Sequence, residues 1–166
     1  IIANPNCSTI QLVMALKALE PFGLKEVRVA SYQSVSGAGR DGIQDLKSQT
    51  QERLKGQQAS PGKSFVQPIA FECQPKVGSD TDSGFCSEEI KIMKESKKIL
   101  NAAELQISAF TVRVPTLNGH GEAVWVTFDQ EVNQETLAQA FQTCPYIQFL
   151  DRGNEKAFHT YKEVTG

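Results

Sequence analysis

The sequence predicts an α+β domain in which helices pack on one face of a mixed β-sheet. Its 166 residues are enough for one domain with its own hydrophobic core. Stretches in which apolar and polar residues alternate, as in half-buried strands, are separated by amphipathic stretches with helix-start signals. This succession of strands and helices is typical of a domain in which helices cover a sheet.

The first predicted elements are a strand at 1–3 and a helix at 9–19. Ser8 and Gln11 have the S-x-x-Q spacing of a capping box, so Ser8 is the expected N-cap of this helix. Pro5 favours an extended chain just before it, which then turns sharply into the helix.

The remaining elements follow from the same two periodicities. Strands are expected at 26–32, 105–114, 123–128 and 146–150, and helices at 41–54, 88–100 and 134–141. Ser87 and Asn133 are the expected N-caps of the last two helices. Polar residues with Gly and Pro predict a surface loop at 55–64, and 65–86 is expected to hold a short apolar piece and a long connection.

Cys7 lies one residue before the expected helix start. Unpaired backbone N–H groups and the positive end of the helix dipole favour a thiolate there, and the thiolate is the nucleophilic form of cysteine. The alternative is a structural cysteine, because free cysteines are often buried as small apolar residues. Spacing alone leaves both readings open. None of the four cysteines forms a C-x-x-C pair or a Cys/His cluster with zinc spacing, so no metal site is expected.

His120 lies between Gly119 and Gly121 in a predicted tight turn. The two glycines give its ring little cover, so it can face a cleft, although a solvent-exposed histidine in a hairpin fits the same pattern. A cysteine and a histidine together suit covalent catalysis at a carbonyl, in which the thiolate attacks and the imidazole moves the proton.

Other polar residues stand at predicted element ends. Gln33 begins a polar, glycine-bearing loop at the end of one strand, and Arg113 stands near the end of another. Glu88 and Lys91 are three apart on one helical face, where a surface ion pair is the simpler interpretation.

Four segments of the chain, in their order and spacing, closely resemble aspartate-semialdehyde dehydrogenases of the bacterial type. They are residues 2–9 (IANPNCST), 32–39 (YQSVSGAG), 88–100 (with EEIK and ESKKIL) and 113–122 (with RVP and GHGE). The resemblance implies that residues 1–166 are the catalytic and dimerisation domain, with the fold of a glyceraldehyde-3-phosphate dehydrogenase-like C-terminal domain. It implies reduction of β-aspartyl phosphate to aspartate semialdehyde with NADPH, through a cysteine thioester, in lysine, threonine and methionine biosynthesis.

The resemblance also implies a role for each matching residue. Cys7 is expected to be the nucleophile and His120 the general acid/base, with Gln33 orienting the covalent adduct. The other expected roles are the substrate carboxylate for Arg113, the substrate ammonium for Glu88, the phosphate for Lys91 and Asn6, and the neighbourhood of the nicotinamide for Ser36 and Gly37. The chain departs from the usual pattern at Phe71-Glu72-Cys73, where Phe-Asn is usual, and at Gly121, where serine is usual.

Further parts of the enzyme are expected outside this chain. The resemblance places an N-terminal dinucleotide-binding domain before Ile1 and a final C-terminal helix after Gly166, and the chain ends without a helix of its own. NADP is expected to be bound mainly by the absent domain, so the isolated chain is not expected to turn over. A homodimer is also expected from the resemblance.

Composition limits the other partners. A net charge of −2 without a basic cluster argues against nucleic acid. Without a signal peptide or an apolar run of about 18 residues, the expected location is the cytoplasm, away from membranes.

Rival readings remain. N-acetyl-glutamyl-phosphate reductase and glyceraldehyde-3-phosphate dehydrogenase share the cysteine-histidine logic but differ around the thiol. A non-catalytic dimerisation or binding module, such as a paralogue that retains the fold, is the alternative from another class.

Overall fold

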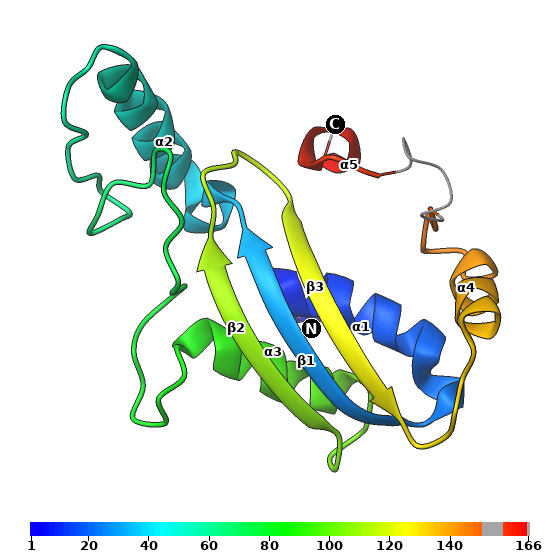
Figure 1. Cartoon of the computed structure of the whole chain (residues 1–166). Helices are drawn as coiled ribbons and strands as arrows, with labels where there is room; N and C mark the ends of the chain where they lie inside the picture. The colour runs from blue at the N-terminus through cyan, green and yellow to red at the C-terminus, as the bar shows by residue number, and fades with distance from the viewer. Residues whose placement is uncertain (151–157, 166) are drawn as a thin grey trace.

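A three-stranded mixed sheet forms the centre of the molecule (Figure 1). The computed structural model describes residues 1–150 and 158–165. Strand β1 (Leu24–Gln33) lies in the middle, parallel to β2 (Gln106–Arg113) and antiparallel to β3 (His120–Phe128). Helices α1 (Cys7–Leu19) and α3 (Ser87–Ile99) cover one face. The predicted mixed sheet with helices on one face is therefore confirmed.

The strand register brings three site candidates to one end of the sheet. Gln33 at the end of β1 is paired with Arg113 at the end of β2 and with His120 at the start of β3. Paired positions on neighbouring strands point to the same face. That face is the one covered by helices, because Val27 and Val29, at alternate positions of β1, are buried there.

The main core lies between this face and the two helices. It contains Leu12 and Leu16 from α1, Ile92 from α3, and valines of β1. These side chains are almost completely buried, and they hold α1 and α3 against the sheet.

A second, smaller core belongs to the part of the molecule that projects beyond the sheet end (Figure 1). The one-turn helix η2 (Val35–Ala38) leads directly into α2 (Gly39–Leu54). The side chains of this core are Val35, Leu46, Phe65, Ile69 and Ala70. Gln49 of α2 fastens the following loop, since its Oε1 accepts from the backbone N–H of Ile69 at 2.8 Å.

Two predicted strands are wrong. Residues 1–3 are not in a strand, and Ile1 and Ile2 are exposed. Residues 146–150 also form no strand: Phe149 stacks on Phe141 of α4 (Gln134–Gln142), with ring centroids 6.1 Å apart, and Tyr146 and Leu150 are exposed.

Other boundaries need smaller corrections. β3 begins at His120 rather than at 123, and it pairs with β1 and not with β2, so His120 is not in a hairpin. The N-cap of α3 is Cys86 rather than Ser87, whereas Asn133 caps α4 as expected.

Two short helices complete the described structure. A one-turn helix, η1 (Glu20–Phe22), joins α1 to β1. A short helix α5 (Tyr161–Thr165) lies near the end of the chain, where no helix was expected. No helix in 1–150 or 158–165 has the length and apolar character needed to cross a membrane.

Candidate active site

The start of α1 places Cys7 at the first position of the helix. Asn6 is the N-cap, and its Oδ1 accepts from the backbone N–H of Ser8 at 3.0 Å and of Thr9 at 3.2 Å. The expectation that Ser8 is the N-cap is therefore wrong, and Ser8 lies buried inside the helix. Asparagine is as good an N-cap as serine, and here its side chain takes that role two residues earlier.

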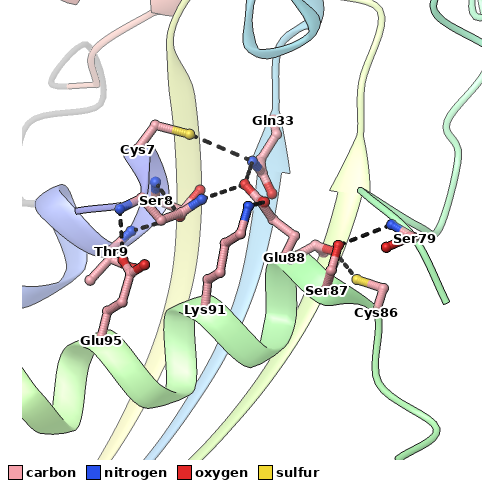
Figure 2. A network of polar contacts seen from close by, with 12 residues as sticks. Cys7, Ser8, Thr9, Gln33, Ser79, Cys86, Ser87, Glu88, Lys91 and Glu95 are labelled. Carbon is pink, nitrogen blue, oxygen red and sulfur yellow. Dashed lines mark hydrogen bonds and ion pairs between the residues drawn. The ribbon is translucent and has the colours of Figure 1, made fainter. Parts of the chain in front are cut away.

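The Cys7 thiol meets two groups from the sheet end. Its Sγ lies 3.3 Å from Nε2 of His120, although the two residues are 113 positions apart in the chain. Nε2 of Gln33 lies 3.9 Å from the same sulfur (Figure 2). The fold thus brings the three residues predicted to be catalytic into one site.

The resting Cys7 thiol is not stabilised as a thiolate. Burial raises the pKa of Cys7, and the negative charge of Glu88 raises this pKa further. The backbone N–H groups at the helix start and the Arg113 guanidinium lower the pKa, but burial outweighs them. The expectation of a thiol with a lowered pKa is therefore wrong, because spacing reports the helix start but not the burial or Glu88.

The His120 ring has partners for both tautomers. Its Nδ1 lies 3.1 Å from the backbone N of Ser34, which donates, and 2.9 Å from the carbonyl oxygen of Gly119, which accepts. When Nδ1 accepts from Ser34, Nε2 carries the proton toward the sulfur; when Nδ1 donates to Gly119, Nε2 is free to take the thiol proton. Burial lowers the pKa of His120, which favours the neutral ring that this exchange requires.

The carboxamide of Gln33 is held in one orientation. Glu88 Oε1 lies 3.2 Å from Gln33 Nε2, and an ionised carboxylate only accepts, so the Gln33 NH₂ faces Glu88 and the sulfur. On the other side, Gln33 Oε1 accepts from Ser31 Oγ at 3.0 Å. An amide that is 1% exposed and fixed at both ends is a preorganised hydrogen-bond donor.

Glu88 lies at the centre of a polar network between α1, α3 and the sheet (Figure 2). Its Oε1 also accepts from Asn6 Nδ2 at 2.6 Å, and Lys91 Nζ lies 3.6 Å from its Oε2. Glu88 is 9% exposed, whereas the Lys91 side chain is mostly exposed. The Glu88–Lys91 ion pair therefore exists, but it extends from a buried carboxylate to the site edge and is not an ordinary surface pair.

Arg113 brings a buried cation to the same sheet end. Its Nη1 donates to the carbonyl oxygen of Ser34 at 2.6 Å, and burial lowers the pKa of Arg113. The guanidinium has five N–H donors in all, in a fork that matches a carboxylate.

Gly37 lies so close to Arg113 that the position has no room for a side chain. A Cβ added to Gly37 would lie 2.8 Å from Arg113 Nη1 and 3.6 Å from His120 Nε2. Its neighbour Ser36 forms a hydroxyl pair with Ser34 at 2.9 Å. The glycine-bearing loop is therefore part of the site.

Ser34, Ser31 and Glu95 belong to the site but were missed by sequence reasoning. Ser34 contacts both His120 and Arg113, and the backbone N–H of Asn6 donates to Glu95 Oε2 at 2.7 Å. One signal was present: Ser31 is a polar residue on the strand face of Val27 and Val29, where an apolar residue is expected.

The arrangement suits chemistry at an acyl group. A thiol, a proton carrier, a fixed amide donor and a cation lie together at one end of the sheet, and this set can form and break a covalent acyl intermediate. No group of three or more His, Cys, Asp or Glu side chains that could hold a metal occurs within 1–150 and 158–165.

Comparisons with known proteins point to one family. Residues 16–166 match the family model described as the semialdehyde dehydrogenase dimerisation domain. The aspartate-semialdehyde dehydrogenase of Aquifex aeolicus is 38% identical over 152 residues, which is 91% of this chain and 45% of that protein. Aspartate-semialdehyde dehydrogenase 2 of Vibrio cholerae is 43% identical over 151 residues, which is 90% of this chain and 44% of that protein.

A solved structure points to the same family. The crystal structure of aspartate semialdehyde dehydrogenase II from Vibrio cholerae, complexed with ASA, has a TM-score of 0.84 and 40% sequence identity. The match covers 87% of this chain and 43% of that one. The chain thus spans less than half the length of these relatives.

Proposed function

The chain belongs to the semialdehyde dehydrogenase dimerisation-domain family, and from this we propose that it is the catalytic and dimerisation domain of an aspartate-semialdehyde dehydrogenase. This membership agrees with the predicted glyceraldehyde-3-phosphate dehydrogenase-like fold. The proposed reaction is reduction of β-aspartyl phosphate to aspartate semialdehyde with NADPH, in lysine, threonine and methionine biosynthesis. Its main support is the 3.3 Å approach of Cys7 Sγ to His120 Nε2.

The first half of the reaction is acyl transfer to sulfur. Cys7 attacks the carbonyl carbon of the acyl phosphate, a C–S bond forms, and phosphate leaves with the electron pair of the C–O bond. His120 Nε2 takes the thiol proton in the tautomer that donates from Nδ1 to Gly119. The Gln33 amide donates toward the developing oxyanion.

The substrate itself assists this step. We assign the substrate ammonium to Glu88 and the substrate carboxylate to Arg113, and the phosphate to Lys91 and Asn6. An ammonium beside Glu88 offsets the negative charge that raises the pKa of Cys7. Substrate binding therefore favours the thiolate that attacks it.

Reduction of the thioester gives the aldehyde. NADP, when bound in its reduced form, supplies the hydride. His120 protonates the resulting oxyanion, and it later takes that proton back as the C–S bond breaks and the sulfur recovers its electron pair. Ser36 and Gly37 are assigned to the nicotinamide from the resemblance, and Gly37 belongs to the loop that lies close to Arg113 and His120. The rest of NADP is assigned to an N-terminal domain outside this chain.

The uncovered face of the sheet is assigned to a homodimer. Tyr32, Phe110 and Trp125 lie on this face and are exposed. Exposed aromatic residues are enriched at protein interfaces. The cytoplasm, where thiols stay reduced, remains the predicted location.

A matched pair of cysteine variants tests the proposed reaction. In the full-length protein, Cys7→Ser should lower the rate of NADPH formation from aspartate semialdehyde, NADP and phosphate by more than about a thousandfold. Cys73→Ser, which changes an exposed cysteine, should leave the rate unchanged. Equal rates in the two variants, or no activity in the unmodified protein, would contradict the proposal.

A further inference from the structure

The two helices that carry the polar network begin in different ways. At the start of α3, the N-cap Cys86 donates its backbone N–H to Glu89 Oε2 at 2.8 Å, and Glu89 is three residues further along the same helix. This is the reciprocal bond of a capping box closed within one helix. The bond that closes this box lies within α3, although Glu89 Oε1 also accepts the backbone N–H of Thr111 in β2 at 3.0 Å.

The start of α1 has the same two bonds, but a second helix supplies one of them. Asn6 Oδ1 accepts from the first backbone N–H groups, as an N-cap does. The third helical residue is Thr9, which has no carboxylate to return the bond. Glu95 of α3 takes its place, because its Oε2 accepts the backbone N–H of Asn6 at 2.7 Å (Figure 2).

Asn6 is therefore held at two points by one face of α3. Glu88 and Glu95 are seven residues apart, two helical turns, and so point the same way. Glu88 accepts from the Asn6 side chain at 2.6 Å, and Glu95 accepts from its backbone. The position of Asn6 depends on how α1 docks on α3.

We propose that Glu95 is a positioning residue for the nucleophile, because its carboxylate fixes the backbone at Asn6 and thereby sets the place of the Cys7 sulfur. Cys7 follows Asn6 directly, so a shift of the cap moves the sulfur. The contacts of that sulfur, 3.3 Å to His120 and 3.9 Å to Gln33, tolerate little movement. Glu95 acts by accepting a hydrogen bond and not through its charge.

The test compares variants that separate hydrogen bonding from charge. Glu95→Gln keeps the length and an acceptor oxygen but loses the charge; Glu95→Asp keeps the charge but is too short; Glu95→Ala loses both. Glu104→Ala, at an exposed position in the connection after α3, is the matched control. The pH dependence of iodoacetamide alkylation is followed for each cysteine in the full-length protein by peptide mass spectrometry.

We expect Glu95→Ala and Glu95→Asp to lower the apparent pKa of Cys7, because a loosened cap lets more water reach the sulfur and so weakens the desolvation that raises this pKa. At pH 7.5, alkylation of Cys7 should become at least about threefold faster. Glu95→Gln and Glu104→Ala should match the unmodified protein. An unchanged Cys7 profile in Glu95→Ala would overturn the proposal, and so would a Glu95→Gln variant that shifts as far as Glu95→Ala.

Global unfolding is recognised by the reactivity of Cys86, which is buried. If Glu95→Ala exposes Cys86, the milder Glu95→Asp decides by the same criteria. Where the proposed function holds, kcat should also fall about tenfold in Glu95→Ala with KM within about twofold. The alkylation result does not depend on that function, so a protein without dehydrogenase activity would refute the proposed function and still test Glu95.

Discussion

The two faces of the sheet differ in the kind of side chain that each carries. Along β1, Ser31 and Gln33 point to the helix-covered face and are 0% and 1% exposed, whereas Tyr32 between them points outward and is 41% exposed. On the neighbouring strands, Arg113 is buried inside, and Trp125 is 62% exposed outside. Polar side chains are buried at this end of the inner face, whereas the outer face exposes Tyr32 here and Trp125 further along, opposite Arg28.

The proposed function, with catalysis on one face and dimerisation on the other, would account for this reversal. A half-exposed sheet normally buries apolar residues and exposes polar ones. Burying Gln33 and Arg113 costs solvation that their hydrogen bonds must offset, which makes sense if they serve chemistry. Exposing Tyr32 and Trp125 makes sense if a second molecule covers them.

The largest expected effect comes from the inner face. His120→Ala should lower dehydrogenase turnover by about a thousandfold, because the proton carrier beside Cys7 is lost. His159→Ala, which changes the other of the two histidines, should leave turnover unchanged. Steady-state kinetics of the full-length protein measure both variants. Similar turnover in the two would contradict the assignment of catalysis to the inner face.

The second prediction concerns Glu122, a half-buried residue on the inner face of β3. Burial raises its pKa from 4.5 to about 7, so the folded state holds this proton more tightly than the unfolded state does. Stability should therefore fall by about 3 kcal/mol as pH rises from about 4.5 to 7, and stay lower above pH 7.

Glu122→Gln should remove this fall and stabilise the protein at pH 8. Glu26→Gln, in an exposed pair with Arg28, should change stability by less than about 0.5 kcal/mol. Urea unfolding at pH 5 and pH 8 measures both variants. An undiminished pH dependence in Glu122→Gln would show that this carboxyl is not its cause.

The outer face gives the third prediction. Trp125→Glu should weaken self-association at least tenfold, since it replaces a large exposed aromatic side chain of the proposed interface with a charged one. The alkylation profile of Cys7 should not change, because Cys7 lies on the other side of the sheet. Sedimentation velocity measures self-association. An unchanged dimer in Trp125→Glu would contradict the proposal that the interface lies on this face.

The smallest expected effect is that of the Glu88 charge on the pKa of the Cys7 thiol. Glu88→Gln should lower the pKa of Cys7 and speed its alkylation about threefold at pH 7, because the carboxylate charge raises that pKa. Glu89→Gln is a poor control, since Glu89 caps α3, so Glu104→Gln serves instead. A slower reaction of Cys7 in Glu88→Gln would contradict this electrostatic reading.

The resemblance to aspartate-semialdehyde dehydrogenases predicted which residues form the site, and their places at element ends explain why they meet. Gln33, Arg113 and His120 stand where predicted strands end or begin, and the register then aligns them. The cap of α1 could not be predicted in the same way. Asn6 and Ser8 are both good caps, and only contacts with α3 decide between them.

Tertiary contacts also explain the other differences. The alternating apolar residues at 146–150 have the pattern of a strand, but α4 offers Phe149 a packing partner. The pKa of Cys7 depends on burial and on Glu88, which is 81 positions away in the chain. The local sequence around 146–150 does not show the packing on α4, and the local sequence around Cys7 does not show its burial or the charge of Glu88.

The most direct test of the central claim, that the inner face holds a thiol which accepts an acyl group, is to trap that group. The full-length protein is incubated with aspartate semialdehyde and NADP without phosphate, and its peptides are analysed by mass spectrometry. We predict an aspartyl group on the Cys7 peptide that disappears when phosphate is added. An aspartyl group on another residue, or none on Cys7, would contradict the account.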